Sequence, residues 1–149
     1  MPSITDYLEN KIIDWLFRGE SYSPPTTLYF ALFSAEATET GGGTEFSGNG
    51  YARVGITASL TNFAGTQADK STTVSTGDSC KTSNNIDIEF PEPTGAWGTA
   101  THMAVFDAAT DGNMLLYGEL KKSKAIDAGA SAPKFKIGKV VFTLDAESE

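Results

Sequence analysis

The turn sequence Ala-Ala-Thr-Asp-Gly at residues 108–112 constrains the fold of this chain more than any other feature. It separates two apolar segments, residues 100–107 and 113–120. Gly112 can supply the positive φ that a tight turn requires at no steric cost, and an Asp-Gly pair between apolar segments is a strong hairpin signal. The two segments are therefore predicted to be neighbouring antiparallel strands.

Four further segments have the apolar pattern of strands. Residues 27–34 are almost continuously apolar, residues 86–90 alternate strictly, and further strands are predicted at 51–59 and 134–144. In the last segment the apolar phase slips at Gly138-Lys139, which predicts a β-bulge. The expected core consists of Leu28, Phe30, Leu32, Ile86, Ile88, Phe90, Val105, Leu115 and Phe142.

Residues 3–18 have the period of a helix, with Ser3 as the predicted N-cap and Gly19 after the last turn. The apolar stripe is wide, and two interpretations stay open. The helix packs on its own sheet, or part of it docks on a neighbouring subunit. The side chains expected to contact a partner are Tyr7, Ile13, Trp15 and Phe17.

Residues 64–85 form a long polar segment in which Val74 is the only large apolar side chain. Loops of this length are uncommon in compact domains and tend to be functional or mobile. Because so few apolar residues hold it down, the loop is expected to become ordered against a partner. Thr72 and Val74 are its candidate contact residues.

Together these segments predict one domain over residues 1–149. A helix precedes an antiparallel β-sandwich or jelly-roll-like domain of about six to eight strands over residues 26–144, and an acidic tail follows at 145–149.

The charge balance argues against several classes of partner. Eleven basic and nineteen acidic residues give a net charge of −8, which disfavours binding to nucleic acid or to anionic membranes. The single cysteine, Cys80, cannot form a disulfide within the chain, and with one histidine it cannot complete a zinc site. The sequence shows no signal peptide and no apolar segment of membrane-spanning length, so we expect synthesis in a reducing cytoplasm.

The residues around the hairpin do not form a recognisable active site. His102 has no nucleophile to activate and is expected to be half-buried and hydrogen-bonded. Asp107 and Asp111 resemble the start of a calcium loop, but the twelfth position is Gly118 instead of a bidentate glutamate. The glycine-rich segments also lack the spacing of nucleotide-binding loops. We therefore expect no catalytic residues, metal or cofactor, and a protein that is not an enzyme.

Two groups of motifs give the chain a family resemblance. "GGGTE" and "GYAR" occur within residues 41–53, and "WGT", "FDA" and "LLYG" follow within residues 97–118. Over roughly residues 7–144 the chain resembles small structural proteins of tailed bacteriophages that are often labelled tail fibre proteins. The resemblance implies a virion component. We expect its partners to be other virion proteins, either the major capsid protein or tail proteins, and we expect a homo-oligomer or many copies in each particle.

Two locations in the virion stay open at this point. The sequence contains no heptad, collagen triplet or other repeat of a fibre shaft, which favours a capsid decoration or cement protein that contacts neighbouring capsid subunits. The alternative is a small tail or tail-fibre-associated protein that binds a receptor or carbohydrate. In that case the aromatic residues Tyr22, Phe46 and Tyr51 would stack on sugars.

Overall fold

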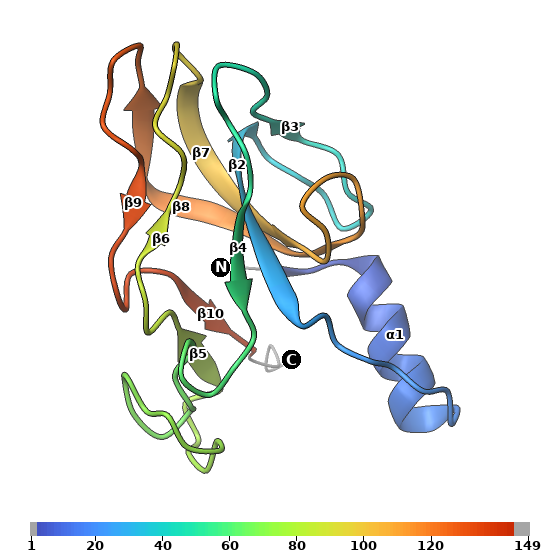
Figure 1. Ribbon diagram of the computed structural model, residues 1–149. Helices are drawn as coiled ribbons and strands as arrows, with labels where there is room; N and C mark the ends of the chain where they lie inside the picture. The colour runs from blue at the N-terminus through green and yellow to red at the C-terminus, as the bar shows by residue number, and fades with distance from the viewer. Residues whose placement is uncertain (1–2, 145–149) are drawn as a thin grey trace.

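A hairpin of two long strands, β7 (Gly98–Phe106) and β8 (Met114–Ile126), forms the centre of the structure (Figure 1). The structure is a computed structural model and describes residues 3–144, so the acidic tail predicted at 145–149 lies outside the described residues. Gly112 has a positive φ, as predicted, at 71°, and Asp111 also has a positive φ, at 51°. The carboxylate of Asp107 accepts a hydrogen bond from the Asn113 N–H at 2.7 Å, which closes the turn. The hairpin is confirmed. β7 begins two residues earlier and ends one residue earlier than predicted, and β8 begins one residue later and ends six residues later.

Within residues 3–144, the largest sheet has six antiparallel strands in the order β1-β8-β7-β2-β3, with β4 also paired to β2. The added strands are β1 (Ser3–Ile4), β2 (Thr27–Ala35), β3 (Thr44–Glu45) and β4 (Val54–Thr57). β2 pairs with β7 along Tyr29–Phe33. Its four consecutive residues from Phe30 to Phe33 are all buried, as expected for a strand that is covered on both faces.

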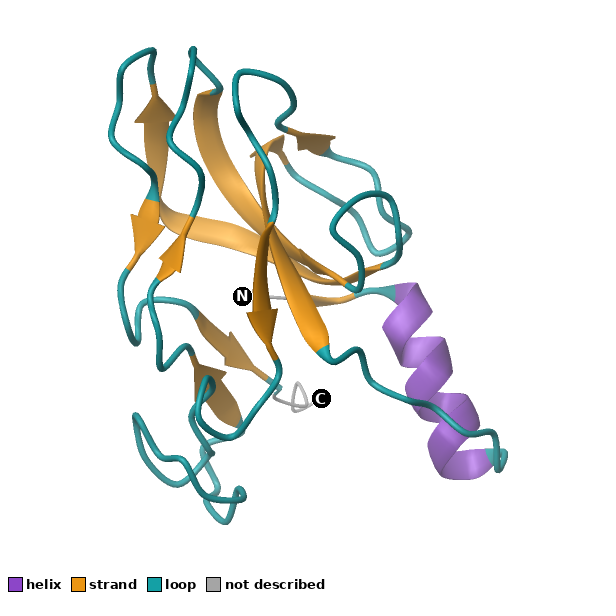
Figure 2. Ribbon diagram, in the orientation of Figure 1, coloured by secondary structure: helices purple, strands orange, loops and turns teal. Residues whose placement is uncertain are grey.

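Two small antiparallel sheets cover one face of the main sheet (Figures 1 and 2). One pairs β5 (Lys81–Ser83) with β10 (Val141–Thr143), and the other pairs β6 (Ile88–Glu89) with β9 (Lys134–Phe135). The predicted mainly β, antiparallel and sandwich-like class with an N-terminal helix is confirmed.

The main core lies between these layers and contains eight of the nine predicted residues. Phe30, Leu32, Ile88, Phe90 and Val105 are buried there, and Leu28, Ile86 and Phe142 pack against them while partly exposed. Leu115 is also buried. A second, smaller cluster on the other face of the main sheet contains Ala31, Phe33, Ala37, Ala104, Phe106 and Met114.

Three predicted strands are shorter than expected. The segment 51–59 is a strand only at Val54–Thr57, and the segment 86–90 only at Ile88–Glu89. The segment 134–144 is divided into Lys134–Phe135 and Val141–Thr143. The prediction of a β-bulge at Gly138-Lys139 is wrong. A turn separates β9 from β10 there, with Gly138 at φ 75° and a hydrogen bond from Lys139 N to Lys136 O at 3.0 Å. A tight turn shifts the apolar phase just as an extra strand residue does.

The helix α1 (Asp6–Phe17) begins three residues later than predicted. Ser3 and Ile4 pair with Tyr117 and Leu116 as strand β1, and Thr5 is the N-cap in place of Ser3. The hydroxyl oxygen of Thr5 accepts a hydrogen bond from Leu8 N at 3.5 Å. The first residues therefore belong to the sheet edge because β8 offers them main-chain partners.

Candidate functional site

The base of α1 is fixed firmly to the main sheet. The Thr5 hydroxyl donates to Met114 O at 2.6 Å, and Thr5 N donates to Leu115 O at 3.1 Å. Asp6 N donates to Glu39 O at 3.0 Å. Thr5 is 2% exposed, so these bonds lie in a protected site and fix the direction in which the helix leaves the domain.

Beyond this base, α1 projects away from the β-domain (Figures 1 and 2). None of residues 6–17, all of them described, is buried. The interpretation that the helix packs on its own sheet is therefore wrong, because the helix projects from the domain and none of its residues is buried. The projecting helix leaves five large apolar side chains exposed, and we call them the helix surface. Their exposed fractions are 37% for Ile12, 49% for Ile13, 57% for Trp15, 60% for Leu16 and 78% for Phe17.

The predicted contact residues fall into two separate groups. Ile13, Trp15 and Phe17 lie on the helix surface, whereas Tyr7 is half-buried at the helix base. Thr72 and Val74 are exposed on the 64–85 loop, which leaves the domain on the side of β5 and β10 (Figure 1). The structure does not bring the helix and the loop together into one surface.

The 64–85 loop is held by its own polar side chains, contrary to the expectation that it needs a partner to become ordered. Gln67 lies at its centre and donates from Nε2 to the hydroxyls of Ser71 (2.6 Å) and Thr73 (2.8 Å). Its Oε1 accepts from Thr76 N at 3.2 Å. Residues 81–83 are strand β5, so part of the segment belongs to the fold. Side-chain amides here take the place of apolar packing.

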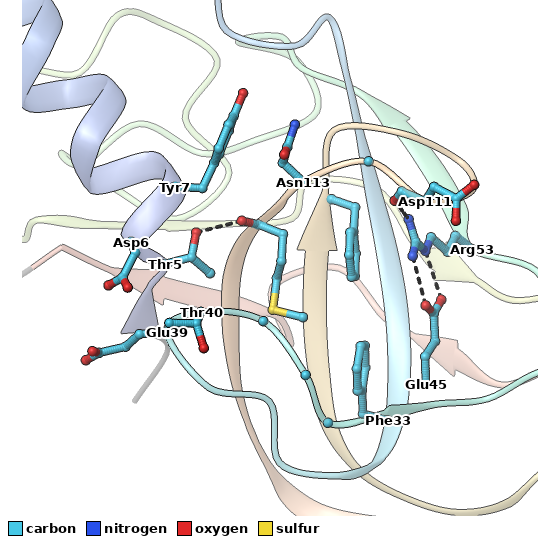
Figure 3. A pocket seen from close by; sticks show the side chains of 16 residues that line it. Thr5, Asp6, Tyr7, Phe33, Glu39, Thr40, Glu45, Arg53, Asp111 and Asn113 are labelled. Carbon is cyan, nitrogen blue, oxygen red and sulfur yellow. Dashed lines mark hydrogen bonds and ion pairs between the residues drawn. The ribbon is translucent and has the colours of Figure 1, made fainter.

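A cleft of about 590 Å³ lies at the base of α1 (Figure 3). Its walls come from the start of the helix, the turn at residues 39–43 and the hairpin turn at residues 111–114. Arg53 lies on one side, where its guanidinium donates to both carboxylate oxygens of Glu45 at 2.8 Å. It also donates to the backbone oxygens of Ala108 and Asp111 and lies 3.5 Å above the centroid of the Phe106 ring.

Tyr51 extends this network into the main core. Its hydroxyl donates to Glu45 Oε1 at 2.9 Å and accepts from Leu32 N at 3.0 Å. Burial, and then the neighbouring Glu45 carboxylate, raise the pKa of Tyr51 well above its usual value. Phe46, 7% exposed, belongs to the core, and Tyr51 packs against it, so the expectation that these two stack on sugars is wrong. Tyr22 is half-buried.

Sequence reasoning missed the roles of Glu45, Tyr51 and Arg53. All three lie in the motifs "GGGTE" and "GYAR", and the signal was an acidic and a basic residue on two short neighbouring segments. Gly43 in the same motif has φ 76°, and an added Cβ would lie 2.9 Å from Ala37 N. These motifs therefore build and fasten the turn beside the cleft.

His102 is half-buried on β7, and its Nδ1 lies 2.8 Å from the hydroxyl of Thr101, as expected for a hydrogen-bonded histidine. It pairs with Phe33 and lies on the face of Ala104 and Phe106. Ala100, two residues earlier on the same strand, lies in the main core instead, because the register is irregular between residues 100 and 102.

The described residues offer no group of three or more His, Cys, Asp or Glu side chains arranged to hold a metal ion. Asp107 uses its two carboxylate oxygens on the Asn113 backbone N–H and side-chain amide, at 2.7 and 2.8 Å. In residues 3–144, no helix has both the length and the apolar character needed to cross a bilayer.

Comparison with known proteins identifies the class. Residues 3–143 match a family of phage fibre proteins, so the protein is a structural component of a phage virion, as the sequence motifs implied. The family is described as podophage GP4 fiber I protein gp80, and the chain belongs to it. No curated protein matches the chain.

Proposed function

We propose that this protein is a non-enzymatic module of the phage fibre assembly and that it attaches to another virion protein through the helix surface of α1. The observation that carries this proposal is the projecting helix. Five large apolar side chains are at least 37% exposed on twelve residues, while the same helix is fixed at its base by buried hydrogen bonds. A rigid base with an exposed apolar end is typical of an anchoring element.

The energetics support docking of this element. Complete burial of one large apolar side chain contributes about 1.5–3 kcal/mol, so three such side chains supply several kcal/mol toward association. Trp15 and Phe17 are aromatic residues, which are enriched among the side chains that dominate binding energy at interfaces. At the end of the helix, the charges of Arg18 and Asp14 are paired with each other at 2.9 Å.

The family description favours the fibre over the capsid as the location. The sequence contains no shaft repeat, and therefore we assign the protein to a compact part of the fibre assembly, at its attachment or its tip. Attachment to the capsid shell as a decoration protein is the competing location, and the two differ in position on the particle and in copy number.

Leu16→Lys and Phe17→Lys test the proposal. Lysine keeps helix propensity and is favourable near the C-terminus of a helix, so the fold should survive while the apolar contact is lost. We expect incorporation into virions to fall at least about tenfold, measured by immunoblotting of purified particles. Asn10→Lys is the matched control on the same helix and should incorporate normally.

Wild-type incorporation of both variants, with circular dichroism unchanged, would show that α1 is not the attachment element. Immunogold labelling gives the location. Labels confined to the fibres would support the proposal. Many labels distributed over the capsid faces would contradict the fibre location and indicate a capsid decoration protein.

A further inference from the structure

A second surface lies along the edge of β8 that β7 does not pair with, and it reaches Met103 of β7 beside its pairing partner Gly118. A groove of about 740 Å³ separates β8 from β10. It is lined by five consecutive residues of β8, Gly118–Lys122, and by the consecutive residues 139–143 that lead into and form β10. Successive side chains of a strand point to opposite faces, so a wall made of consecutive residues is the edge of a strand. The groove therefore lies between two strand edges.

Pairing within the described residues leaves both of these edges open. β8 pairs with β7 on one side, and β1 covers only Leu116 and Tyr117 on the other. β10 pairs with β5, whose far side is occupied by residues 63–64. In residues 3–144, no strand pairs with β8 from Leu120 onward on the groove side, or with the second edge of β10. Open edges of this kind present main-chain donors and acceptors to an added strand.

The side chains around the groove define what such a strand would carry. The floor is apolar and consists of Met103, Leu120, Phe135, Val140 and Phe142. The rim holds the four exposed lysines Lys81, Lys121, Lys122 and Lys139, against one carboxylate, Glu119. This concentration of positive charge stands on a chain whose net charge is −8.

We propose that the groove binds an extended acidic segment of another protein chain as an added β-strand between β8 and β10. Its main chain would hydrogen-bond to the open edges. Alternate apolar side chains would reach the floor, and the acidic side chains between them would face the lysines. The lysines repel basic strands and second copies of their own edge, so the same residues that protect the edge select the partner. This surface is separate from α1 and does not depend on the proposed attachment.

The test uses a short synthetic peptide of alternating glutamate and valine, titrated into the full chain by isothermal calorimetry. We expect saturable binding that Lys121→Glu with Lys122→Glu weakens at least about tenfold. The matched control, Lys11→Glu with Lys70→Glu, makes the same change in net charge at exposed lysines outside the groove and should bind normally. Hydrogen exchange should show slower exchange of the backbone amides of residues 120–124 on binding.

A peptide of the same sequence with alternate amides N-methylated separates strand addition from charge attraction. It should fail to bind, because it cannot complete the main-chain hydrogen bonds. Equal binding of the methylated and unmethylated peptides overturns the proposal, and so does unchanged binding to the groove variant. Lysine-dependent binding of sulfated polysaccharide or phosphatidylglycerol vesicles, with no binding of the peptide, would assign the groove to a different anion and also overturn it.

Discussion

At the scale of single residues, Glu45 and Arg53 connect parts of the molecule that are distant in sequence. Arg53 immediately precedes β4 and reaches the backbone oxygens of the β7–β8 turn, and Glu45 on β3 holds its guanidinium at 2.8 Å. The Arg53 side chain is 7% exposed, so both the charge and its hydrogen bonds lie in a protected environment. Removal of Glu45 would leave the buried guanidinium of Arg53 without an opposite charge.

Tyr51 gives this network a pH dependence. Its pKa is raised above 10 in the folded protein, so the folded state retains a proton that the unfolded state releases above pH 10. Below that pH the stabilisation is fully present, and it is lost as the pH rises, at no more than about 1.4 kcal/mol per pH unit. Chemical denaturation from pH 8 to 11 measures this.

Tyr51→Phe is the comparison for that measurement. It should lower the free energy of unfolding by about 1–2 kcal/mol at pH 8, because the bonds to Glu45 and Leu32 are lost, and it should reduce the decline above pH 10. Parallel curves for the two proteins would contradict the assignment of the shift to Tyr51.

At the scale of elements, α1 and the 64–85 loop are held in place by different interactions. α1 is fixed at one end by Thr5 and leaves its apolar side chains exposed. The loop lacks apolar residues and is ordered by polar side chains around Gln67. The two elements therefore differ in what a substitution does, since one presents a surface and the other maintains its own shape.

Gln67→Leu should open the loop locally without unfolding the domain. It removes the bonds to Ser71, Thr73 and Thr76, each with a net contribution of about 0.5–1.5 kcal/mol. Hydrogen exchange in residues 65–79 should become faster, while the thermal midpoint changes little. Thr72→Ala is the control in the same loop, and unchanged exchange in both variants would mean that Gln67 does not hold it.

At the scale of the whole molecule, the main sheet has apolar side chains on both faces, but only one face is covered by the small sheets. Phe90 lies where the layers meet, 1% exposed, with Tyr51 stacked at 6.3 Å and Phe135 edge-on at 6.3 Å. The strands β5, β6, β9 and β10 have only two or three residues each. The second layer is therefore held mainly by side-chain packing.

Phe90→Ala should lower the free energy of unfolding by about 3–5 kcal/mol, because it leaves a cavity between the layers. Urea denaturation measures this loss. Leu60→Ala, at a site that is 52% exposed, should change it by no more than about 0.5 kcal/mol. A loss below about 1 kcal/mol for Phe90→Ala would show that the second layer does not depend on this packing.

The sequence by itself determined the antiparallel class, the β7–β8 hairpin, the strands around Phe30 and Val105, and the residues of the core. These follow from local periodicity and turn chemistry, which act over a few neighbouring residues. The sequence motifs also indicated the phage structural protein family. Only the tertiary structure decided that α1 projects, that Ser3 joins a strand, and that Arg53, Glu45 and Tyr51 meet. The groove between β8 and β10 also follows only from the tertiary structure. Each of these depends on partners far apart in the chain, and an apolar stripe has the same period whether a sheet, a second protein or solvent lies beside it.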